Sequence, residues 1–207
     1  MLKYIIYILV AAVVIGLLIG GAHLLRVKLK NKKELTKYSG PRVEVNNNFG
    51  RVLVVYYSLS GNTRDIAQNI KAKTNADIYE IKTVPPMVSG RQMYMDVRNQ
   101  LKTGKYPEIE KDIPNMENYD LIFVGAPVWW YTAATPVLSF LETVDFKGKK
   151  VVPFSTQGSN YGKFFEDFNA KAKNAKILQS ANFNNLHGKY TQEQDNKISV
   201  WLNNLEK

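Results

Sequence analysis

A run of small polar residues lies where an apolar, strand-like segment gives way to a helical pattern: Ser58, Leu59, Ser60, Gly61, Asn62 and Thr63. Three of them carry hydroxyls that can donate hydrogen bonds, and Gly61 lets the backbone approach a ligand closely. A helix that starts here directs unpaired N–H groups and about half a positive charge at the same point. The loop therefore favours a phosphate group, although Ser, Thr and Asn also cap helices that bind nothing.

Two more loops with ligand-binding side chains follow later strand-like segments. One, the aromatic loop, contains Pro127, Val128, Trp129, Trp130 and Tyr131. The other, the third loop along the chain, is rich in hydroxyls and amides and contains Ser155, Thr156, Gln157, Gly158, Ser159 and Tyr161. Neighbouring aromatic side chains are costly to leave in water, so either a flat aromatic ligand or ordinary core packing explains the aromatic loop. The third loop can hydrogen-bond the edge of a heterocycle, and its tyrosine offers a stacking ring.

The elements that carry these loops alternate between strands and helices from residue 51 onward. Apolar runs predict strands near 52–57, 78–81, 121–125, 151–154 and 177–178, and helical periodicity predicts helices near 63–73, 91–102, 135–143, 161–173 and 191–205. This alternation is typical of an α/β fold whose parallel sheet is covered by helices on both faces. Ligands of such sheets bind beyond the carboxyl ends of the strands, where the three loops lie.

Several kinds of chemistry are excluded by residues that the chain lacks. It has no cysteine and only two histidines, which excludes thiol catalysis, Fe–S clusters and Cys/His zinc sites. Neither G-x-x-x-x-G-K-[ST] nor G-x-G-x-x-G occurs, so nucleoside triphosphates and dinucleotides lose support. The first loop contains no carboxylate, which argues against a response-regulator receiver with its magnesium site. Any redox chemistry has to come from an organic cofactor.

Taken together, three motifs resemble those of flavodoxins: Tyr57 to Thr63, Pro127 to Trp130, and Phe154 to Gly158. The likeness covers about residues 51–206. It implies a flavodoxin-like three-layer sandwich with a five-stranded parallel sheet of order 2-1-3-4-5, in its short-chain form. It also implies flavin mononucleotide (FMN) as the cofactor, with its phosphate in the first loop and its ring between the other two.

Carried over position by position, the resemblance assigns a role to each loop. Ser58, Leu59, Ser60, Gly61, Asn62 and Thr63 surround the phosphate, and Pro127, Val128, Trp129, Trp130 and Tyr131 border the ring. Trp129 and Tyr161 form the expected stacking pair. Thr156 and Gly158 bond the pyrimidine edge, beside Ser155, Gln157 and Ser159. The flavin would do the chemistry, so no catalytic acid, base or metal site is assigned.

One departure from the flavodoxin pattern bears on the kind of electron transfer. Many flavodoxins have glycine just after the first stacking position, where a peptide flip accompanies one-electron reduction. This chain has Trp130 there, and a flip costs more without glycine. We therefore expect two-electron behaviour.

The N-terminal segment from Tyr4 to Leu25 has no formal charge. As a helix it would be about 33 Å long, which is enough to span a bilayer. A retained anchor is favoured over a cleaved signal peptide, because the apolar run is too long and lacks an A-x-A-like site. The expected organisation is an anchor at 1–25, a basic polar linker at 26–50 and an FMN-binding domain at 51–207.

The positive charge of the chain gathers beside this anchor. Residues 1–51 hold nine Lys/Arg against two Glu, whereas the rest of the chain holds nineteen against sixteen acidic residues. No nucleic-acid motif accompanies the cluster, so a membrane surface explains it better than nucleic acid does. The positive-inside rule predicts a single-pass protein of the cell membrane with its soluble domain in the cytoplasm. The opposite orientation stays open if the segment acts as an export signal.

Two classes of function fit this reading. One is an NAD(P)H-dependent FMN oxidoreductase that reduces a small acceptor such as a quinone. The other is an electron-transfer module that serves a redox protein partner. The chain has no nicotinamide fingerprint, but reductases of this fold bind the nicotinamide only transiently over the flavin. A membrane scaffold without a cofactor is a third reading, and the intact phosphate loop argues against it.

Overall fold

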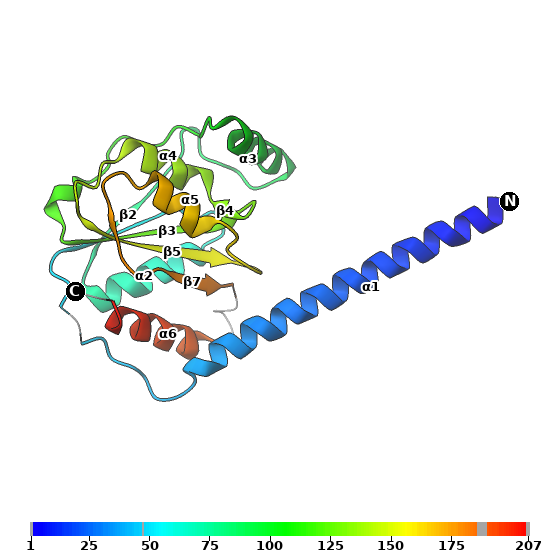
Figure 1. Ribbon diagram of the computed structural model, residues 1–207, viewed down its shortest axis with the longest axis horizontal. Helices are drawn as coiled ribbons and strands as arrows, with labels where there is room; N and C mark the ends of the chain where they lie inside the picture. The colour runs from blue at the N-terminus through cyan, green and yellow to red at the C-terminus, as the bar shows by residue number, and fades with distance from the viewer. Residues whose placement is uncertain (1, 47, 186–189, 206–207) are drawn as a thin grey trace.

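A parallel sheet forms the centre of the α/β domain in the computed structural model, which describes residues 2–46, 48–185 and 190–205 (Figure 1). Its strands are β1 (Val52–Tyr56), β2 (Asp77–Glu80), β3 (Leu121–Trp129), β5 (Lys150–Gln157), β6 (Lys176–Ile177) and β7 (Ala181–Asn184). Their order is β2-β1-β3-β5-β6, and β7 pairs with β5 farther along. A short β4 (Thr132–Ala133) pairs antiparallel with the end of β3.

The predicted strand order 2-1-3-4-5 is confirmed, with one elaboration. The fifth strand, predicted at 177–178, consists of two pieces, because β6 and β7 both pair in parallel with β5. The second piece ends at Asn184, so its carboxyl end reaches the edge of the sheet where the three polar and aromatic loops lie. The last two residues of the predicted domain, 206–207, lie outside the described residues.

Helices cover both faces of the sheet because successive strand residues bury their side chains on opposite sides. Along β1, Leu53 and Val55 pack with the cluster around α4 and α5, whereas Val52 and Val54 pack with the cluster around α2 and α6. The helices are α2 (Asn62–Thr74), α3 (Arg91–Thr103), α4 (Thr135–Thr143), α5 (Phe164–Lys171) and α6 (Thr191–Asn203). Two short 3-10 turns are η1 (Thr36–Tyr38) and η2 (Met116–Asn118). The predicted fold class is thereby confirmed.

A single long helix, α1 (Leu2–Leu35), precedes the domain and projects away from it (Figure 1). Its 34 residues give a length of about 51 Å. It contains an 18-residue stretch of mean hydropathy 2.7, none of whose residues is buried against the domain. The helix is therefore long and apolar enough to cross a membrane. The helix continues past residue 25, where the sequence predicts the anchor to end. The first ten residues of the predicted linker, 26–35, are therefore helical.

Residues 38–46 of the predicted linker run along α6. The Asn196 side chain donates to the carbonyls of Tyr38 and Pro41 and accepts from the Val43 N–H, each at 3.0 Å. Asn203 makes a similar pair of bonds two turns later. Amide side chains can satisfy both kinds of backbone group at once. This segment is therefore held to the domain by long-range contacts that its polar composition does not reveal.

Candidate functional site

The first polar loop ends in an open helix N-terminus. Gly61 is the N-cap of α2, with a left-handed φ of 93°, and no side chain caps the first turn. The loop is shaped from within, because Ser58 Oγ accepts from the Gly61 N–H and Ser60 Oγ accepts from Asn62 Nδ2, both at 3.1 Å. The first N–H groups of a helix have no partner inside it. They and the helix dipole favour an anion at this position.

A buried hydroxyl pair joins this loop to the third one. The hydroxyls of Thr63 and Thr156 lie 2.7 Å apart, and the two residues are 1% and 3% exposed. Thr63 belongs to the first turn of α2 and Thr156 to the end of β5. The contact holds the phosphate-loop helix in register with the neighbouring strand, and the predicted site residues of two separate motifs meet there.

All three predicted loops line one small cavity, which we call the cradle. Its volume is about 150 Å³, and its walls are Ser58, Leu59, Ser60, Asn62, Thr63, Pro127, Val128, Trp129, Thr156, Gln157, Gly158 and Asn185. These side chains offer hydroxyls and amides and carry no formal charge, so an anion would meet donors without acidic repulsion. The donor set therefore fits the phosphate end of FMN, with Trp129 beside it for an aromatic ring.

The sequence-based site missed Asn185. This residue follows β7, the second piece of the fifth strand. The fifth strand was predicted to stop near 178, so its true carboxyl end was overlooked. The alternation of Ala181, Asn182, Phe183 and Asn184 was the available signal, since it has the period of a half-buried strand.

The aromatic loop is a tight hairpin with an unusual backbone. Trp129 pairs with Thr132 across it, and the two residues between them, Trp130 and Tyr131, have positive φ values of 49° and 65°. Two-residue hairpins of this kind favour Asn-Gly, because other residues cost about 1–2 kcal/mol each in the left-handed region. Backbone strain of this type is found most often at active sites and ligand-binding loops.

The three aromatic side chains of the hairpin point to different places. The ring of Trp129 lies edge-on to Tyr57, with centroids 5.6 Å apart, and lines the cradle. The ring of Trp130 packs on Tyr94 of α3 at 4.5 Å. Tyr131 is 65% exposed. Only one tryptophan therefore lies beside the cradle, as expected from the alternation of neighbouring side chains.

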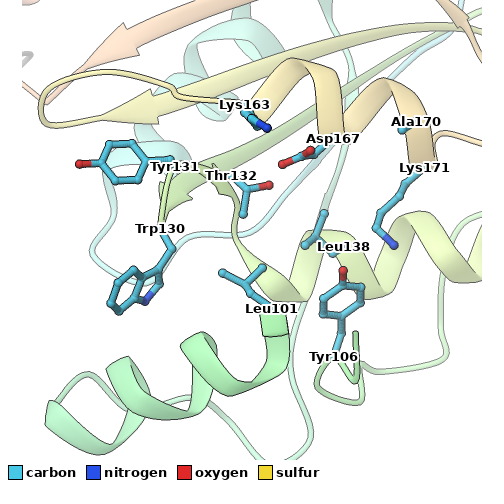
Figure 2. A pocket seen from close by; sticks show the side chains of 10 residues that line it. All are labelled: Leu101, Tyr106, Trp130, Tyr131, Thr132, Leu138, Lys163, Asp167, Ala170 and Lys171. Carbon is cyan, nitrogen blue, oxygen red and sulfur yellow. The ribbon is translucent and has the colours of Figure 1, made fainter. Parts of the chain in front are cut away.

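Two larger cavities flank the hairpin. One, the α5 cavity of about 470 Å³, lies between Trp130 and Tyr131 on one side and Lys163 and Asp167 on the other, as Figure 2 shows. The Oγ1 atom of Thr132, which also lines it, is buried and has no hydrogen-bond partner among the residues that the structure describes. The second, the outer cavity of about 580 Å³, lies between the hairpin, the third loop and α1. Cavities of this size hold small organic ligands.

Six predicted site residues lie outside the walls of the cradle. Gly61 caps α2, and Ser155 is fully buried, donating to Gln157 Oε1 at 3.0 Å. Ser159, Trp130 and Tyr131 line the outer cavity. Tyr161, the expected second stacking ring, lines none of the three cavities, and its ring lies 5.2 Å from that of Phe165. Its stacking role stays a prediction.

Tyr57, whose ring packs against Trp129, remains neutral at ordinary pH. Burial raises the pKa of Tyr57 to about 12, and the negative charge of Glu80 adds to the effect. A phenol that stays protonated offers Trp129 a neutral ring edge and is no general base. This agrees with a site in which the bound cofactor, rather than a side chain, performs the chemistry.

Comparisons with known proteins agree with this geometry. A family model described as flavodoxin matches residues 51–205. An uncharacterized protein of Methanocaldococcus jannaschii is 28% identical over 126 residues, which cover 59% of this chain and 66% of that protein. The chain thus spans slightly less than two thirds of this curated relative.

Two solved structures have the same fold. A flavoprotein from Lactobacillus acidophilus NCFM, crystallised in complex with FMN, is 27% identical, with a TM-score of 0.59, and the match covers 64% of this chain and 92% of that one. A Bacteroides eggerthii protein is 26% identical, with a TM-score of 0.56, covering 73% of this chain and 95% of that one.

Proposed function

Because this chain belongs to the flavodoxin family, we propose that it is a membrane-associated oxidoreductase that uses FMN to pass electrons from NAD(P)H to a quinone. The observation that carries the proposal is the convergence of three loops on one cradle at the N-terminus of α2. The cofactor is FMN, whose single phosphate matches a cradle with one helix N-terminus and no charged wall.

Each loop has a task toward this cofactor. The N–H groups at the start of α2 and the hydroxyls of Ser60 and Thr63 would hold the phosphate. Trp129 would border the ring, and Thr156 with Gly158 would bond its polar edge. FMN, when bound, supplies reversible two-electron chemistry that no side chain here provides. The protein's own contribution is to bind the cofactor, orient it and keep water from one side of it.

The overall reaction balances without a protein acid. NAD(P)H gives up a hydride, the quinone takes up two electrons and two protons, and the second proton comes from solvent. The products are NAD(P)⁺ and a hydroquinone. The cavities of about 470 and 580 Å³ beside the hairpin support a reaction with small substrates, since each has the size of a small-molecule site.

An electron-transfer module for a protein partner is the second candidate. It is favoured by the exposure of the hairpin, where Tyr131 is 65% and Trp130 is 37% exposed. Aromatic side chains at a protein surface are typical of docking sites. A carrier of this kind would exchange electrons with its partner but would not oxidise NAD(P)H rapidly by itself.

The membrane part of the proposal rests on α1 and its charges. We propose that α1 spans the cell membrane once and that the domain lies in the cytoplasm, since Arg26, Lys28 and Lys30 follow the uncharged stretch at once. Protease added to intact spheroplasts should leave the domain uncut, whereas lysed cells should lose it. Digestion of the domain before lysis would show the opposite orientation, with the domain outside the cytoplasm.

The decisive experiment is uptake of FMN by the full-length protein in detergent. Purification with excess flavin should give a yellow protein that retains FMN and not riboflavin, because only FMN has the phosphate. Anaerobic mixing with NAD(P)H and a quinone then separates the two candidates: a reductase turns over, and a carrier does not. Failure to retain FMN would overturn both.

A further inference from the structure

The last turns of α1 are docked on the domain beside the third flavin loop. Asn31 is only 5% exposed, and its Nδ2 donates to the carbonyl of Gly158 at 2.9 Å. Leu35 is fully buried. Asn184 at the end of β7 donates to the carbonyl of Asn31 at 3.5 Å. The candidate membrane helix is thus tied directly to a loop that lines the cradle.

A second route joins α1 to the same loop. Glu34 of α1 is ion-paired with Lys197 of α6, whose charge is buried with the side chain 8% exposed. Lys197 also donates to the carbonyl of Asn182 at 2.6 Å, and the Asn182 side chain accepts from Gln157 at 2.9 Å. A buried charge is tolerated only when it is paired. Two hydrogen-bonded routes therefore hold α1 in one position relative to the flavin loops.

The outer cavity lies between α1 and the cofactor site. It shares Val128, Gln157 and Gly158 with the cradle, so the two cavities adjoin. Its opposite wall is formed by His23, Leu24 and Val27 of α1. These residues stand where the uncharged stretch of the helix, which ends at Leu25, gives way to basic residues. If the uncharged stretch spans a bilayer, the outer cavity lies at the membrane interface.

Several exposed apolar side chains lie at or near the outer cavity. Beyond α1, the large exposed hydrophobic side chains of the described residues are Val84, Val88, Tyr94, Met95, Trp130, Tyr131 and Tyr161. Three of the seven belong to the hairpin and the α3 residue packed on it, and the third loop adds another. Figure 1 shows the arrowheads of β5 and β7 pointing toward the side on which α1 projects. Aromatic side chains are enriched where proteins meet the membrane interface.

We propose that α1 is a wall of the acceptor site and that the outer cavity receives the ring of a lipid-soluble quinone directly from the bilayer. This deepens the proposed function and rests on it. The quinone takes two electrons and two protons from the reduced flavin and returns to the bilayer as a hydroquinone, leaving the flavin oxidised. A water-soluble acceptor needs no such wall, because the hairpin is exposed to solvent.

A cavity-filling substitution tests the proposal. Full-length protein loaded with FMN is placed in phosphatidylcholine vesicles that contain an isoprenoid-tailed benzoquinone, photoreduced without oxygen, and followed by flavin absorbance as it reoxidises. Val27→Trp places a large ring in the wall and should slow reoxidation at least about tenfold. Leu24→Trp is a second variant of the same wall. Leu25→Trp is the matched control, since Leu25 is adjacent, 57% exposed and outside the cavity.

Ferricyanide, a water-soluble oxidant, reports whether each variant is intact. We expect it to reoxidise all four proteins at rates within about twofold of one another. Equal quinone rates for Val27→Trp, Leu24→Trp and Leu25→Trp would overturn the assigned wall. A wild-type protein that reacts with ferricyanide but not with the tailed quinone would overturn the acceptor site. Failure to take up FMN would instead contradict the proposed function, and NAD(P)H plays no part in this assay.

Discussion

The cradle and the outer cavity adjoin, but they are built in opposite ways. The cradle is small, polar and formed by loops that each follow a strand of the sheet. The outer cavity is nearly four times as large, adds aromatic and aliphatic side chains to the polar residues of the third loop, and takes one wall from a helix outside the sheet. One end of the site therefore suits an anionic group and the other an apolar ring.

This difference indicates how the site is oriented. The polar end rests on the N-terminus of α2, inside the domain, whereas the apolar end faces the candidate membrane helix. With its phosphate in the cradle, FMN would direct its ring toward the residues that the two cavities share, Val128, Gln157 and Gly158, and the outer cavity beyond them would receive the acceptor ring. Of the following three substitutions, the first acts on the cradle, the second on the tyrosine that packs against Trp129, and the third on the hairpin beside the outer cavity.

Removing the buried hydroxyl at the cradle should have the largest effect. Thr63→Val keeps the side-chain volume but loses a phosphate donor and the 2.7 Å contact with Thr156. FMN affinity should fall about 10- to 100-fold, or about 1.5–3 kcal/mol, as measured by fluorescence titration. Thr74→Val, at the other end of the same helix, is the control and should bind FMN normally. Unchanged FMN affinity in Thr63→Val would indicate that the loop only caps the helix and does not bind the phosphate.

The buried tyrosine beneath Trp129 should make stability depend on alkaline pH. Because burial and Glu80 raise the pKa of Tyr57 to about 12 from 10.0, the folded state keeps a proton that the unfolded state loses. This contribution is complete below pH 10 and is lost as the pH rises toward 12. The free energy of unfolding should therefore fall by about 1–2 kcal/mol more in wild type than in Tyr57→Phe. Urea unfolding of both proteins at each end of this pH range measures the difference. Equal losses of unfolding free energy in wild type and Tyr57→Phe would contradict the prediction.

Relaxing the hairpin should have the smallest effect on stability and a separate effect on turnover. Tyr131 has a φ of 65° and is largely exposed, so Tyr131→Gly should raise the free energy of unfolding by about 0.5–1 kcal/mol. Quinone-dependent reoxidation should slow, because a wall of the outer cavity is removed. Asn75→Gly, at a φ of 52° far from the site, should raise the free energy of unfolding by less, since asparagine tolerates this conformation. A less stable Tyr131→Gly would show that the ring packs more than its exposure indicates.

The cradle was largely predictable because each of its loops is a continuous motif. Polar and aromatic runs such as Ser58–Thr63 directly follow apolar strand-like segments, and parallel strands bring their carboxyl ends to one edge of a sheet. The sequence therefore located eleven of the twelve residues that line the cradle. Asn185 was missed because the fifth strand is interrupted, and its second piece has no continuous apolar run.

The wall that α1 contributes to the outer cavity was not predictable, for a different reason. Asn31 lies in a stretch of basic and polar residues, and local sequence gives it the appearance of a linker. Its bond to Gly158 joins positions 127 residues apart, and Glu34 finds Lys197 across a similar separation. Neither contact can be predicted from local periodicity, because each joins residues that come together only when the domain has folded.

The sequence by itself determined the α/β fold, the position of the phosphate loop and the presence of a long apolar helix, since all of these follow from local patterns of burial, period and loop chemistry. The order of the strands came from the resemblance to flavodoxins. Only the tertiary structure decided that Trp130 packs on α3, where the fifth strand ends and how α1 lies against the flavin loops. The physical reason is that side-chain direction in a tight turn and packing between distant segments depend on the shape of the assembled domain.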